Sequence, residues 1–115
     1  MKEVVWVGSS LEDLCKFPED VQDEIGYALY QAQLGFKAKN AKPLTGIESG
    51  VMEIVSDFDK NTYRAVYATK IGDVIYVLHS FQKKSTKGIS TQKKDIHLIE
   101  QRLKEAKRIE KERGE

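Results

Sequence analysis

The feature that most constrains the fold is one unbroken apolar run, VIYVLHSF, over residues 74–81. It lacks the alternation of polar and apolar residues that is typical of a half-exposed strand. The run therefore predicts a central strand, covered on both faces of a sheet. At 115 residues the chain is long enough for one such core and too short for two, so we expect a single domain over residues 1–115.

Hydrophobic periodicity and turn residues predict the other elements. In chain order, these are a strand over 4–7, a short helix over 10–17, a longer helix over 18–34, a strand from 51, strands over 63–69 and 74–81, and a charged helix from about 91. The order is β-α-α-β-β-β-α. It predicts an α+β domain in which a twisted antiparallel sheet carries two N-terminal helices and one C-terminal helix.

The net charge of +1 hides an asymmetry along the chain. Residues 1–59 hold 5 Lys/Arg and 11 Asp/Glu, whereas residues 60–115 hold 14 Lys/Arg and 7 Asp/Glu. The densest basic stretch spans 82–94 and contains no acid; its cations are Lys83, Lys84, Lys87, Lys93 and Lys94. Such a stretch indicates either a surface that binds a polyanion or a loop kept soluble by its lysines.

Hairpin register predicts which side chains meet at the end of the sheet. If residues 72–73 form the centre of a two-residue turn, Arg64 lies opposite Phe81. Arg64 is then a diagonal neighbour of His79 and Lys83, within reach of long side chains. The apolar strand would therefore end by presenting cations beside an arginine.

A second hairpin adds a carboxylate to this group. With a turn over 59–62, Asp57 lies opposite Arg64, so the expected cluster contains Arg64, His79, Lys83 and Asp57. Arg64 is either a group that binds a polyanion or the partner of Asp57 in a structural salt bridge.

The remaining candidates also have two interpretations each. His79 is either a satisfied core histidine or, with a pKa near neutrality, a group for proton transfer. Lys83 and Lys84 are neighbours on a strand, so only one of them can face inward. Tyr63 either packs in the core or on a face of the sheet or, because it is beside Arg64, stacks on a base.

Several other chemistries have no support in the sequence. It contains no glycine-rich phosphate loop, no Cys/His metal spacing, no Gly-x-Ser-x-Gly elbow and only one cysteine. We therefore expect no metal and no cofactor. No apolar run approaches the roughly 20 residues of a membrane helix, and we expect a cytoplasmic protein. A cluster of cations without a metal suits a phosphodiester backbone.

Three stretches together resemble the RelE/ParE toxin superfamily, and more narrowly its phage-derived HigB-like branch. They are KPLTG at 42–46, YRAVY at 63–67 and HSFQKKS at 79–85, the last followed by a long basic helix. The resemblance implies a RelE-like fold and the toxin of a type II toxin-antitoxin module, with a helix-turn-helix antitoxin as partner. Most members cleave mRNA in the ribosomal A site without a metal.

The resemblance also implies roles for individual residues. Arg64, Lys83 and Lys84 match the family's cations, which stabilise charge as an RNA 2′-hydroxyl attacks the neighbouring phosphate. We expect His79 to assist them, and we expect RNA contacts from Tyr63 and from Lys87, Lys93 and Lys94.

One departure from the family pattern keeps two other functions open. Residues 47–59 hold four acids and no cation, where many ribonuclease members carry lysine or arginine. An acid there either acts as a base or pairs with Arg64. The alternatives are a non-enzymatic gyrase inhibitor and an inactive remnant that only binds its antitoxin.

Overall fold

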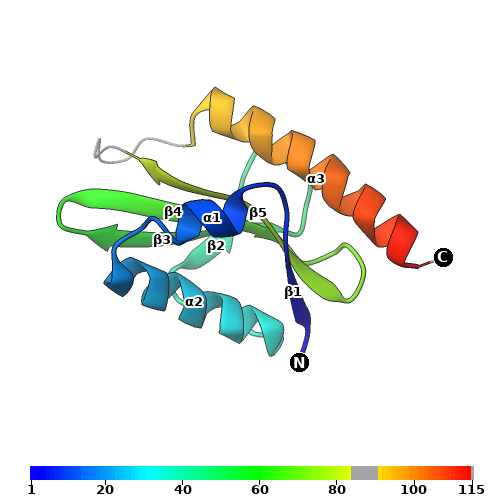
Figure 1. The fold of residues 1–115 in the computed structure, drawn as a ribbon, viewed down its shortest axis with the longest axis horizontal. Helices are drawn as coiled ribbons and strands as arrows, with labels where there is room; N and C mark the ends of the chain where they lie inside the picture. Colours follow the sequence, from blue (N-terminus) through cyan, green and yellow to red (C-terminus); the bar gives the residue numbers. More distant parts are fainter. Residues whose placement is uncertain (84–90, 115) are drawn as a thin grey trace.

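The computed structural model describes residues 1–83 and 91–114 and confirms an α+β fold (Figure 1). Within these residues there are five strands and three helices. Their bounds are β1 (Glu3–Trp6), α1 (Ser10–Leu14), α2 (Glu19–Gln33), β2 (Ala41–Pro43), β3 (Val51–Phe58), β4 (Asn61–Ala68), β5 (Val74–Lys83) and α3 (Lys93–Arg113).

The sheet is mixed, which corrects the antiparallel sheet expected from the sequence. Its strand order is β1-β5-β4-β3-β2, and β1 pairs with β5 in parallel. Strands β3, β4 and β5 form the predicted antiparallel meander. The three-residue β2 lies at the edge, where Pro43 costs little because an edge strand leaves some N–H groups unpaired. Neither β1–β5 pairing nor so short an edge strand has a local sequence signal.

The sheet divides the core in two, with α2 and α3 on opposite faces (Figure 1). On one face, α1 and α2 pack on side chains that include Ile54, Tyr63 and Val77. On the other, α3 packs on side chains that include Val66 and Leu78. The strand predicted from VIYVLHSF is therefore covered on both sides, as expected. None of the helices in residues 1–83 and 91–114 has the length and apolar character needed to cross a membrane.

Register around Arg64 agrees with the sequence, although the turn that sets it does not. Arg64 pairs with Phe81 and Val66 pairs with His79, as predicted. Strand β4 ends at Ala68, however, so the connection is longer than a two-residue turn. A β-bulge between Val66 and Tyr67 on this ladder compensates for the longer connection.

Candidate functional site

The β-bulge places two consecutive residues of β5 toward α3. Opposite Val66 and Tyr67 stand His79 and Val77, so Leu78 is the extra residue. Leu78 belongs to the core cluster under α3, and the neighbouring His79 contacts Asp95 of α3. Bulges recur beside active sites because they re-aim side chains. Here the bulge shifts the alternation of β5 by one residue. As a result, Lys83 points to the same face of the sheet as Arg64.

Arg64 is paired with a carboxylate, but not the one that the sequence suggested. The β3–β4 turn is tight, with Asp59 and Lys60 at φ 50° and 66°, a combination typical of a type I′ turn. It pairs Asp57 with Thr62 rather than with Arg64. The partner of Arg64 is instead Glu53, with Nη1 2.9 Å from Oε1. The expectation that Asp57 lies opposite Arg64 is wrong because the turn is two residues shorter than assumed.

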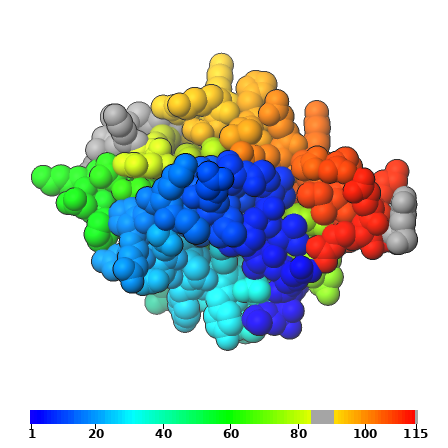
Figure 2. Space-filling model, viewed as in Figure 1, coloured from blue at the N-terminus to red at the C-terminus, as the bar shows by residue number. Residues whose placement is uncertain are grey.

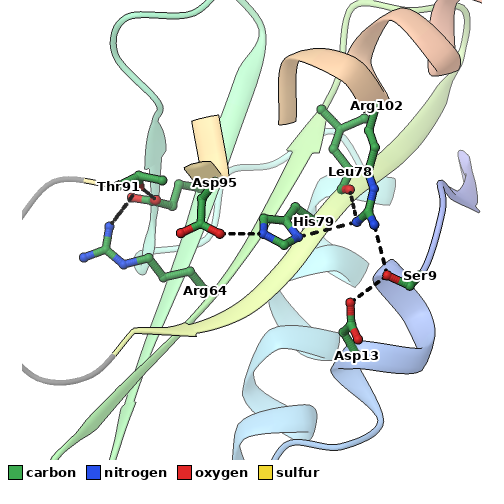
Figure 3. Close-up of polar contacts among 9 residues, drawn as sticks. Ser9, Asp13, Arg64, Leu78, His79, Thr91, Asp95 and Arg102 are labelled. Atoms are coloured by element: carbon green, nitrogen blue, oxygen red, sulfur yellow. Dashed lines mark hydrogen bonds and ion pairs between the residues drawn. The ribbon is translucent and has the colours of Figure 1, made fainter. Parts of the chain in front are cut away.

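Glu53 and Thr91 complete a small buried group around this arginine. Thr91 Oγ1 donates to Glu53 Oε2 at 2.7 Å and lies 3.5 Å from Arg64 Nη1. The side chains of Arg64 and Glu53 are only 12% and 2% exposed. Because Thr91 precedes α3, this group links the sheet to the start of the helix (Figure 3). An acid on β3 thus pairs with Arg64, one of the two roles that the sequence left open.

Lys83 is the second cation on this face and is itself buried. Burial lowers its pKa below the ordinary value, and the positive charge of Arg64 lowers it further. Lys42 on β2, which the site prediction did not include, acts in the same direction. Glu53 and Asp95 act in the opposite direction, so cations and acids meet at the end of β5, and Arg64 and Lys83 are the cations there that an anionic group would contact.

His79 is buried, and both of its ring nitrogens lie within hydrogen-bonding distance of a partner. Its Nε2 lies 2.9 Å from Asp95 Oδ1, and its Nδ1 lies 3.4 Å from Arg102 Nη1 (Figure 3). If Nε2–H donates to the carboxylate, Nδ1 accepts from the guanidinium. Burial lowers the pKa of His79, against the opposing effect of Asp95, so the neutral ring is favoured. Both ring nitrogens therefore have partners, which fits the first of the two interpretations that the sequence left open, a satisfied core histidine.

Arg102 connects α3 to two other elements and was not among the predicted residues. It donates to Leu78 O and to Ser9 Oγ, each at 3.0 Å, and Ser9 Oγ donates in turn to Asp13 Oδ2 (Figure 3). Gly8 lies nearby with φ 58°, and a Cβ there would approach Arg102 Nε to 2.7 Å, so a larger residue would displace the guanidinium. The only signal for Arg102 in the sequence is an arginine beside the apolar stripe of the last helix.

Tyr63 lies on the other face of the sheet from Arg64. Its ring packs against Phe17 with centroids 4.9 Å apart, and the residue is 6% exposed. Adjacent residues of a strand point to opposite faces of the sheet. Because Arg64 faces α3, its neighbour Tyr63 lies under α1 and α2. This position does not fit the expected stacking on a base.

The other predicted lysines divide into two pairs. Lys93 and Lys94 are exposed in the first turn of α3, where cations gain nothing from the helix dipole. Lys84 and Lys87 lie outside the described residues. Among the residues that the structure describes, no group of three His, Cys, Asp or Glu side chains has the arrangement of a metal site.

The comparison with known families gives one match. The family model described as phage derived protein Gp49-like (DUF891) matches residues 12–104, which include Arg64, Lys83 and most of α3. No curated protein matches the chain.

Proposed function

Because the chain belongs to the Gp49-like family of phage-derived proteins, we propose that it is a ribosome-dependent mRNA endoribonuclease. The family is related to RelE/HigB-type toxins. In this proposal it is the HigB-like toxin of a type II toxin-antitoxin module, acts in the cytoplasm and inhibits translation. A helix-turn-helix antitoxin is its partner. The reaction uses no metal and no cofactor.

The observation that carries the proposal is the placement of Arg64 and Lys83. They lie on one face at one end of the sheet, and the charge of Arg64 contributes to the lowered pKa of Lys83. A phosphodiester entering there would meet two cations at a protein surface that excludes much of the water, where charge stabilisation is most effective. Lys93 and Lys94 at the start of α3 would add attraction for the RNA backbone.

The proposed reaction is attack by an RNA 2′-hydroxyl on the adjacent phosphorus. A bond forms between the 2′-oxygen and phosphorus while the bond to the 5′-oxygen breaks, leaving a cyclic phosphate and a 5′-hydroxyl. The 2′-hydroxyl proton is released to solvent, and the leaving oxygen takes a proton. Arg64 would stabilise the charge on the phosphate, and Lys83, made more acidic by burial, would donate that proton.

Glu53 determines how Arg64 is held before RNA arrives. Its carboxylate and Thr91 fix one guanidinium nitrogen of Arg64. We propose that this pairing orients the arginine. The same pairing is the observation that favours the second candidate, a protein that binds gyrase or its antitoxin without catalysis, because a neutralised arginine has less charge to offer a phosphate.

The deciding experiment is expression in bacteria with separate readouts for translation, mRNA cleavage and DNA damage. We expect translation to stop before replication, with cuts in mRNA that require ribosomes. Intact translated mRNA together with a DNA-damage response would support gyrase inhibition. Growth without either effect, while a co-expressed neighbouring helix-turn-helix protein is bound, would indicate an inactive remnant.

A further inference from the structure

The outer face of α2 and the residues just after it carry exposed apolar side chains that the core does not use. Tyr27, Tyr30 and Leu34 follow one another at helical spacing and are 63%, 46% and 45% exposed, and the neighbouring Phe36 is 69% exposed. These four residues are called the aromatic face below. They make up most of the large apolar side chains exposed in the described part of the chain. Clustered exposure of this kind marks an interaction site.

The same side of the helix is acidic at its N-terminal half. Asp20, Asp23 and Glu24 are exposed and lie one to two turns before Tyr27 on the same stripe. The segment from residue 12 to residue 24 contains six acids and one cation, Lys16, which lies within 4.0 Å of two of those acids. Figure 2 shows α1 and α2, in blue to cyan, side by side on one surface of the molecule.

A hollow of about 300 Å³ lies at the other end of the aromatic face. It is lined by side chains of α2, of the segment that follows α2 and of the sheet, including Ala32, Phe36 and Met52. Lys2 and Lys37 are also among the residues that line it. The surface therefore changes from acidic at the start of α2, through apolar, to basic beyond its end, and an apolar side chain of a partner could anchor in the hollow.

These observations determine the chemistry of the occupant. An acidic surface repels phosphates, which excludes RNA as the occupant of this face. We propose that the aromatic face and the adjoining acids bind a basic amphipathic segment of a partner protein. Its cations would lie over Asp20, Asp23 and Glu24, and its apolar side chains over Tyr27, Tyr30 and Leu34.

The position of this surface leaves the proposed RNA site open. α2 packs on the opposite face of the sheet from α3, whereas Arg64 and Lys83 face α3. A partner on α2 would therefore tether or recruit the protein without covering the cations. The inference does not depend on the proposed function, since it concerns different residues and a different face.

The test uses a helix-forming peptide of about 15 residues with leucines on one stripe and arginines over the half that meets the acids. We expect the peptide to bind the full chain and to shift amide resonances of α2. Tyr27→Ser/Leu34→Ser should weaken binding at least about tenfold at unchanged melting temperature. Phe58→Ser, which removes an exposed apolar side chain elsewhere, should bind like the unaltered protein.

Charge reversal provides the second measurement. The variant Asp20→Lys/Asp23→Lys should no longer bind the basic peptide. It should instead bind a matched peptide in which glutamates replace the arginines. Equal binding of both peptides to the unaltered protein would overturn the proposal, as would resonance shifts confined to residues away from α2, the aromatic face and the hollow. If sedimentation shows a dimer that Tyr27→Ser/Leu34→Ser dissociates, a second copy of the chain covers this surface and the proposed occupant is wrong.

Discussion

Arg64 has two roles, because it forms a buried salt bridge in the structure and stabilises the phosphate in the proposed reaction. Its salt bridge with Glu53 is buried, and Glu53 is only 1% exposed. Removing one member of a buried ion pair costs about 3–5 kcal/mol, because the other charge is left uncompensated. A loss of function in Arg64→Ala would therefore mix lost catalysis with lost stability.

A paired variant separates these effects. We expect Arg64→Ala to abolish RNA cleavage and lower the free energy of unfolding by about 3–5 kcal/mol, measured by urea denaturation. Arg64→Gln/Glu53→Gln removes both charges and should recover most of the stability while remaining inactive. If this double variant cleaves RNA normally, Arg64 is a structural residue and the proposed site is wrong.

His79 predicts a pH dependence of stability. Its pKa is lowered from 6.5, chiefly by burial, so the unfolded chain binds the proton more readily than the folded one. Stability is therefore full above about pH 6.5 and falls as the pH decreases toward the folded-state pKa.

We expect the urea midpoint to fall between about pH 7.5 and about pH 5, and to fall less in His79→Gln. The matched control is His97→Gln, because His97 is exposed on α3. A pH dependence that is identical in His79→Gln and the unaltered protein would contradict the assignment of a buried, neutral ring.

Lys83 lies at the end of β5, and Lys84 follows it in the sequence. Lysines that bind phosphates release counterions, so each lost contact reduces the log-log salt slope of binding by roughly 0.7–0.9. We expect Lys83→Ala/Lys84→Ala to weaken ribosome binding, flatten its salt dependence and remove most cleavage. Lys107→Ala/Arg108→Ala on α3 is the control, since both cations pair with nearby acids. Equal effects would indicate diffuse charge attraction.

The connection from β1 to α1 depends on one glycine. Gly8 has φ 58°, and a Cβ there would meet the Arg102 guanidinium that joins α3 to α1 and β5. Gly8→Ala should destabilise the protein through both backbone strain and displacement of Arg102. Gly26→Ala, in the open on α2, should instead stabilise by about 0.5–1 kcal/mol. Thermal unfolding of both variants gives the comparison.

Across the molecule, the sheet separates the two proposed binding surfaces. Arg64 and Lys83 lie on the side of α3, and the aromatic face lies on α2 and the residues that follow it. Figure 1 shows these two helices on opposite faces of the sheet. We expect a 2′-O-methyl RNA, which binds but cannot be cleaved, to slow amide hydrogen exchange at the ends of β4 and β5 and at the start of α3. Exchange in α2 should not change. Protection of α2 by RNA would contradict the separation of the two surfaces.

Local patterns were enough to predict most elements and one important register. The apolar run at 74–81 indicated a strand covered on both faces, and Arg64 does pair with Phe81. Strand alternation and hydrophobic periodicity are properties of neighbouring residues, so they can be read without the fold. The Arg64 register nevertheless depends on the bulge at Leu78, which offsets a turn that is longer than assumed.

Tertiary structure alone decided the partners of the predicted residues. Arg64 pairs with Glu53 rather than Asp57, Tyr63 lies on the far face, and His79 is enclosed by Asp95 and Arg102 of α3. Each of these outcomes depends on how a distant element packs or on the length of a turn. The residue types make a cation site chemically possible, but contacts between elements far apart in the chain determine which charges remain available to it.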